Sequence, residues 1–118
     1  MDERTVALNE KLQRLLKDSA ETAVQLDRAD GTIQGVPHYS VIELRAHELG
    51  QQLSRAIQRR QMGELAAGQA MRAKCPACGT VSELAAANRL VTSIDGEVEL
   101  HELKGSCPAC RRDFFPSA

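Results

Sequence analysis

The stretches Cys75-Pro-Ala-Cys-Gly79 and Cys107-Pro-Ala-Cys110 decide the fold of the second half of this 118-residue chain. In each Cys-x-x-Cys unit, which we call a knuckle, a tight turn brings two sulfur atoms together, and the proline pre-sets that turn. Two knuckles supply four thiolates, the ligand set of a closed tetrahedral zinc site with Zn–S bonds of about 2.3 Å. One structural Zn²⁺ is therefore expected on the four cysteines of the chain, Cys75, Cys78, Cys107 and Cys110.

Two other interpretations of the four cysteines stay open. Disulfides are disfavoured, because a bridge within one knuckle closes only a tiny loop and adds little stability. The knuckles also resemble those of rubredoxins, small electron carriers that hold one iron ion on four cysteines. Rubredoxins surround that iron with aromatic side chains, whereas this chain has one tyrosine, two phenylalanines and no tryptophan. Zinc is therefore favoured over iron.

The segment between the knuckles has the pattern of a β-hairpin. Residues 90–94 are rich in β-branched side chains, Asp95-Gly96 is a strong turn signal, and residues 97–100 alternate between acidic and apolar side chains. Residues 81–84 are expected to form a third, shorter strand. The sequence thus predicts a zinc ribbon over residues 74–118, in which two knuckles clamp the ends of the hairpin. Such a small sheet is marginal alone, so we expect it to fold only with its metal.

The turn also predicts a register and a solvated face for the hairpin. With Asp95-Gly96 at the centre of the turn, Val91 would pair with Leu100 and Ser93 with Val98. The acidic residues of the second strand are expected to face solvent. These residues are Glu97, Glu99 and Glu102.

Two amphipathic helices are predicted before the ribbon, over residues 2–28 and 41–66. Apolar residues recur in both at steps of three and four, and a connector that contains glycine and proline turns the chain back. Ser40 and Glu43 have the spacing of a capping box, which predicts Ser40 as the N-cap of the second helix. The predicted fold class is α+β, with an antiparallel helical hairpin over residues 1–73 followed by the zinc ribbon.

Each predicted helix carries one apolar stripe. The stripes comprise Leu8, Leu12, Leu15, Leu16, Ala23 and Leu26 in the first helix, and Ile42, Ala46, Leu49, Leu53, Ala56 and Ile57 in the second. Two helices with one stripe each enclose only a thin core. We therefore expect them to form a homodimer, or to bind a partner helix, by coiled-coil packing of these stripes. The alternative is that the helical hairpin folds back on the ribbon.

The charge of the chain is balanced overall but basic near the cysteines. The formal net charge is −1, from 15 basic and 16 acidic side chains, so no overall positive field attracts nucleic acid or an anionic membrane. Both knuckles lie at one end of a ribbon, which gathers the basic residues beside them into a compact patch suited to phosphate contacts. These residues are Lys74, Lys104, Arg111 and Arg112. The alternative is that they only balance the charge of four thiolates.

Enzymatic, small-molecule and membrane functions find little support in the sequence. Four thiolates leave no open position on a zinc ion, the histidines are scattered at His38, His47 and His101, and no catalytic triad or phosphate-binding loop is present. The chain is therefore expected not to be an enzyme. No apolar stretch approaches the roughly 20 residues that span a bilayer. The acidic start at Asp2 and Glu3 is unlike a signal peptide, so a cytoplasmic location is expected.

Three strings in the ribbon carry a resemblance to a family: Cys-Pro-Ala-Cys-Gly at 75–79, Gly-Glu-Val-Glu-Leu at 96–100 and Phe-Phe-Pro at 114–116. Together they resemble the zinc-ribbon region ahead of the catalytic domain in a group of bacterial insertion-sequence DDE transposases. The resemblance implies that the four cysteines bind zinc and that DNA is the partner. It also implies a catalytic domain after the ribbon. Because the sequence stops at Ala118, we expect no transposition chemistry from this chain, which would be a remnant, a fragment or a stand-alone relative.

These observations rank three functions for the chain. The first is a non-enzymatic zinc-ribbon module that binds DNA or is recruited to it. The second is a protein–protein adaptor that uses the helical stripes, with a purely structural zinc ribbon. The third is a rubredoxin-like iron electron carrier.

Overall fold

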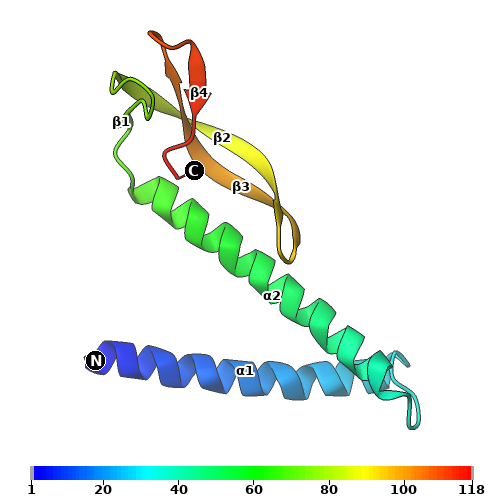
Figure 1. Ribbon diagram of the computed structural model, residues 1–118. Helices are drawn as coiled ribbons and strands as arrows, with labels where there is room; N and C mark the ends of the chain where they lie inside the picture. The colour runs from blue at the N-terminus through cyan, green and yellow to red at the C-terminus, as the bar shows by residue number, and fades with distance from the viewer. Residues whose placement is uncertain (1, 118) are drawn as a thin grey trace. The chain divides into compact units, whose positions relative to one another are not determined.

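The computed structural model describes residues 2–117. Over this range the chain forms two α-helices followed by four β-strands (Figure 1). The elements are α1 (Glu3–Ala29), α2 (Tyr39–Gly68), β1 (Arg72–Lys74), β2 (Val81–Ser93), β3 (Gly96–Cys107) and β4 (Arg112–Phe114). The strands form one antiparallel sheet in the order β1-β2-β3-β4. The α+β class predicted from the sequence is confirmed.

The chain divides into two compact units, one up to Ala46 and one from His47, so the division falls within α2. The antiparallel pairing of the two helices and a domain boundary at residue 73 stay predictions. Neither helix of the described range is apolar over a length that would cross a bilayer.

In the first unit, α1 is well capped but buries very little. The Asp2 carboxylate accepts a hydrogen bond from the Thr5 backbone N–H (2.7 Å), which satisfies one of the free amides of the first turn. Asp27 is the buried residue of this helix, and its carboxylate accepts hydrogen bonds of 2.9 and 3.1 Å from Nε of Arg45 in α2. The five leucines of the predicted stripe in α1 are all exposed.

The start of α2 differs from the prediction. The helix begins at Tyr39, so Ser40 lies inside the first turn and is not the N-cap. His38 takes that place: its Nδ1 lies 3.2 Å from the Ser40 backbone N–H, which donates to it, and its carbonyl accepts from the N–H of Val41 (3.0 Å). The capping-box spacing was misleading because an imidazole nitrogen can accept the same first-turn amide that a serine hydroxyl would.

In the second unit, β2 and β3 form the predicted hairpin, in a register shifted by two residues. Val91 pairs with Val98 and Ser93 with Gly96, so Ile94 and Asp95 form the turn. The Ser93 hydroxyl accepts from the Asp95 N–H (3.1 Å) and donates to the Gly96 carbonyl (2.7 Å), and Gly96 has a φ of 104°. Glycine adopts this positive φ without the steric cost that a Cβ would bring. A shift of two keeps every side chain on its predicted face.

The other strands of the sheet differ in part from the sequence prediction. Residues 81–84 do not form a separate strand but are the start of β2, where residues 81–83 pair with β1. The short strand β4 follows the second knuckle and pairs with the end of β3. The two short strands thus lie at the end of the hairpin that carries the cysteines (Figure 1).

α2 contacts the hairpin turn through polar side chains. The Ser54 hydroxyl donates to the Asp95 carboxylate (2.5 Å), and Arg55 Nη1 donates to the Asp95 carbonyl (2.8 Å). The aliphatic residues Leu53 and Ile57 on the same stretch of helix are 48% and 50% exposed. The apolar stripe of α2 is therefore not the face that contacts this turn.

The core of the second unit lies beside the knuckles. Gly105 of β3 pairs with Leu84 of β2 and with Phe114 of β4. A Cβ at Gly105 would lie 2.5 Å from Phe114 Cζ and 3.0 Å from Leu84 Cδ2, so only glycine lets the ring pack across this strand. The buried members of the cluster are Cys75, Leu84, Leu103, Cys107 and Phe114.

Glu102 corrects the expectation of a solvated acidic face. Glu97 and Glu99 are exposed, but Glu102 is only 4% exposed. Nε and Nη2 of Arg89 donate to its two carboxylate oxygens at 2.7 and 2.9 Å, and the Ser117 hydroxyl donates to the same carboxylate. A carboxylate with three donors is stable in a buried position because its charge is paired.

Candidate metal centre

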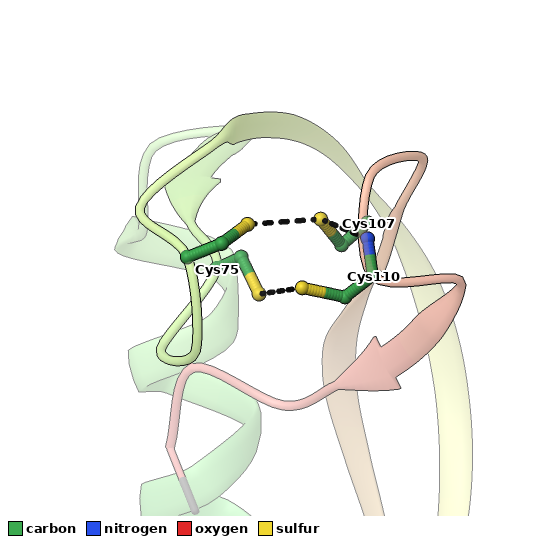
Figure 2. Close-up of side chains that lie close together, drawn as sticks. Cys75, Cys107 and Cys110 are labelled. Atoms are coloured by element: carbon green, nitrogen blue, oxygen red, sulfur yellow. Dashed lines mark hydrogen bonds between the residues drawn. The ribbon is translucent and has the colours of Figure 1, made fainter.

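The four cysteine sulfur atoms converge between the two knuckles. All four lie within 4.8 Å of one another, with 3.5 Å between Cys78 and Cys107 and 4.0 Å between Cys75 and Cys110. Figure 2 shows the Cys75 and Cys110 sulfur atoms pointing toward each other from opposite knuckles. All four thiols are free. These separations exceed a disulfide bond of about 2.0 Å, so the sulfur atoms meet as a cluster and not as two bridges.

The spacing of the sulfur atoms fits a tetrahedral metal ion. Four ligands about 2.3 Å from one zinc ion lie about 3.8 Å apart in a regular tetrahedron. The sulfur separations of 3.5–4.8 Å bracket that length. Four sulfur donors also bind zinc or iron in preference to harder cations. The predicted ligand set is therefore assembled, and it can hold one metal ion.

The two knuckles have the same backbone geometry. The Gly79 N–H donates to the Cys75 carbonyl (2.9 Å), and the Arg111 N–H donates to the Cys107 carbonyl (2.8 Å). Both donors have a positive φ, 76° at Gly79 and 56° at Arg111. Arg111 thus adopts the left-handed conformation that glycine adopts at the equivalent position, although its Cβ makes this conformation less favourable.

Hydrogen bonds and neighbouring thiols shift the pKa values of two of the cysteines, Cys78 and Cys110. The hydroxyl of Thr80 lies 3.1 Å from Cys78 Sγ, and hydrogen bonds from the Thr80 side chain and backbone lower the pKa of Cys78 to about 6. The pKa of Cys110 is raised to about 12, first by its hydrogen bond to Cys78 and then by burial. Four thiolates this close repel one another. A bound cation would remove that repulsion and deprotonate all four.

The cysteines differ in their access to solvent. Cys75 and Cys107, the first residue of each knuckle, are 4% and 2% exposed. Cys110 is half-buried, and Cys78 is exposed. The centre is therefore anchored in the core on one side and open to solvent at Cys78.

The histidines lie outside this cluster in the part of the chain that the structure describes. His101 Nδ1 lies 2.6 Å from Asn88 Oδ1 of the neighbouring strand. His38 caps α2, as described above.

The basic residues predicted to form a patch flank the knuckles, but one of them is paired. Lys74 ends β1 directly before Cys75, and Arg111 and Arg112 follow Cys110; all three are exposed. Lys104 Nζ lies 3.5 Å from a carboxylate oxygen of Asp113, which also accepts from the Ser106 hydroxyl. These two neighbours lower the pKa of Asp113. Asp113 was not among the residues predicted from sequence, and its negative charge weakens the basic patch at Lys104.

Comparison of the chain with protein-family models, with curated proteins and with solved structures gives no match. The cysteine geometry and the surface around it therefore carry the functional argument.

Proposed function

We propose that this chain is a non-enzymatic zinc-ribbon module that binds DNA. The observation that supports it best is the convergence of four free cysteines within 4.8 Å at the end of the sheet. Zinc is favoured over iron because Phe114 is the one aromatic residue in the core cluster around the cysteines. The iron centre of a rubredoxin-like carrier would be surrounded by more aromatic side chains.

In this proposal the metal ion is structural. Four thiolates saturate a tetrahedral ion and leave no position for substrate or water. The two short strands and both knuckles surround the core cluster, so metal binding and the packing of this end of the sheet stabilise each other. The residues that hold the ion are the four predicted ligands, Cys75, Cys78, Cys107 and Cys110.

The exposed cations beside the knuckles would contact the DNA backbone. Lys74, Arg111 and Arg112 are exposed next to ligand cysteines, where no acidic partner is seen among the described salt bridges. Cations placed in this way bind phosphates without reading the base sequence. The strings shared with insertion-sequence transposases support DNA over other polyanions, as an expectation from resemblance.

Fluorescence anisotropy of labelled duplex DNA tests this proposal. The zinc-loaded chain should bind DNA more weakly as the salt concentration rises. The slope of the logarithm of the binding constant against the logarithm of the salt concentration should become shallower by about 2 when two phosphate contacts are lost. We would remove them with Arg111→Gly plus Arg112→Ala, because glycine suits the left-handed conformation at residue 111. Lys104→Ala should have a smaller effect, because Asp113 already pairs with Lys104.

The matched control is Lys11→Ala plus Arg14→Ala, which removes the same charge from α1. This variant should bind DNA with the salt slope of the unaltered chain. Equal losses in both double variants would show that net charge, not the patch, governs binding. No saturable binding at low salt would contradict the DNA proposal.

A second candidate function, a protein–protein adaptor, is favoured by the exposure of the stripe in α1. Leu8, Leu12 and Leu15 are 54%, 52% and 51% exposed. Helices gain most of their stability from packing an apolar face, so a partner helix or a second copy would stabilise α1. Sedimentation equilibrium tests this, with Leu12→Lys plus Leu15→Lys expected to abolish any self-association and Gln13→Lys as the control on a neighbouring position.

A further inference from the structure

The hydroxyl of Ser82 is buried without a hydrogen-bond partner. Ser82 is 7% exposed, and its Oγ is the one buried side-chain nitrogen or oxygen that lacks a partner within residues 2–117. Buried hydroxyls are nearly always hydrogen-bonded, because removing them from water without a partner is unfavourable. An orphaned hydroxyl in a well-packed sheet therefore points to an acceptor that becomes available in another state of the protein.

The sheet places Ser82 on the metal side of β2. Burial alternates along the start of β2, so Ser82 lies on the same face as Leu84. Leu84 pairs with Gly105, and antiparallel strands run in opposite directions. The pairing of β2 with β3 ends at Leu84 and Gly105, and two further residues along each strand lead to Ser82 and Cys107.

A second strand supports this placement. Ser82 pairs on its other side with Ala73 of β1. Ala73 packs against the buried cluster that contains Cys75 and Cys107. Ser82 thus pairs with a residue that packs against the metal-centre core.

We propose that Ser82 is a positioning residue of the metal centre, whose hydroxyl donates a hydrogen bond to the Cys107 thiolate when the metal is bound. This inference rests on the proposed metal site. A neutral thiol is a weak acceptor, whereas a metal-bound thiolate keeps its negative charge and accepts well. Cys107 already lies 3.4 Å from the Cys110 backbone N–H, which donates to it. A second donor would hold the most buried ligand in place and moderate its charge.

Cobalt substitution of the full chain tests this inference. Co²⁺ in a tetrahedral thiolate site gives a sulfur-to-metal charge-transfer band, and a hydrogen bond to sulfur raises the energy of that band. Ser82→Ala should shift the band to longer wavelength. It should also weaken zinc binding about tenfold in competition with a chelator, the lower end of the range for lost outer-sphere partners.

Two variants make the result specific. Ser82→Thr keeps a hydroxyl and should keep the band position. Ser106→Ala removes an exposed hydroxyl near the second knuckle that already donates to Asp113, and it should leave both band and zinc affinity unchanged. A shift in Ser82→Ala alone would support the hydrogen bond.

Three outcomes would overturn it. An unshifted band and unchanged affinity in Ser82→Ala would show that the hydroxyl does not contact a ligand. Weaker affinity with an unshifted band would assign Ser82 a packing role only. If the unaltered chain gave no tetrahedral Co²⁺ spectrum, the metal site itself would fail, and this result is distinguishable from the other two.

Discussion

At the scale of single residues, the two knuckles show how one backbone shape is reached from different sequences. Gly79 and Arg111 occupy equivalent positions and both have a positive φ. The cluster of four cysteines could be predicted from sequence because a Cys-x-x-Cys turn is a local feature. The neighbours Thr80 and Asp113 could not, because a hydroxyl near sulfur and an acid near a lysine have no fixed sequence spacing.

The two knuckle positions should respond in opposite ways to substitution. Gly79→Ala should destabilise the zinc-loaded chain by about 1–2 kcal/mol, the cost of a Cβ in the left-handed region, since no other atom lies within 4 Å of that Cβ. Arg111→Gly should stabilise it by roughly 0.5 kcal/mol after the entropy of glycine in the unfolded chain is subtracted. Urea unfolding of the two variants measures both. Destabilisation by both substitutions would refute the equivalence of the knuckles.

Gly105 gives a steric prediction at the same scale. Gly105→Ala should destabilise the chain by about 1–3 kcal/mol, because its Cβ would meet the Phe114 ring at 2.5 Å. Gly50→Ala is the control: Gly50 lies inside α2 with open space around it, and alanine there should stabilise the helix by up to about 1 kcal/mol. Thermal unfolding of the zinc-loaded variants distinguishes the two. Equal melting temperatures would show that Phe114 can move aside freely.

At the scale of elements, local patterns predicted the helices and the hairpin, and long-range contacts decided the rest. The Asp95-Gly96 signal predicts these two residues at the centre of the turn. The hydrogen bonds of the Ser93 hydroxyl and the positive φ of Gly96 place the turn one residue earlier. The burial of Glu102 could not be predicted from alternation along β3. Its partner Arg89 lies on β2, thirteen residues away.

The Arg89–Glu102 pair can be tested with a double-mutant cycle. Arg89→Ala would leave the Glu102 carboxylate buried with only Ser117 as donor, and should cost about 2–3 kcal/mol, since the arginine is itself partly exposed. Arg89→Met combined with Glu102→Leu should recover most of this loss, because an apolar pair of similar volume needs no charge compensation. Urea unfolding of Arg89→Met, Glu102→Leu and the double variant, each compared with the unaltered chain, completes the cycle and gives the coupling energy. A double variant as unstable as Arg89→Ala would contradict the ion-pair explanation.

At the scale of the whole molecule, the two compact units bury very different surfaces. In the unit from His47 onward, one buried cluster contains Cys75 and Cys107 together with Leu84, Leu103 and Phe114. In the unit up to Ala46, the one buried residue of α1 is Asp27, and its leucines are exposed. The first unit therefore leaves its apolar stripe exposed, whereas the second buries apolar side chains beside the cysteine cluster.

Native mass spectrometry of the full chain, purified without added metal, tests the central claim of a four-cysteine zinc site most directly. We predict a species with one zinc ion per chain that is lost in Cys107→Ser, the variant that removes the most buried ligand. A mass that corresponds to one iron ion would support the electron carrier instead. A metal-free chain lighter by four hydrogens would show two disulfides and contradict the account.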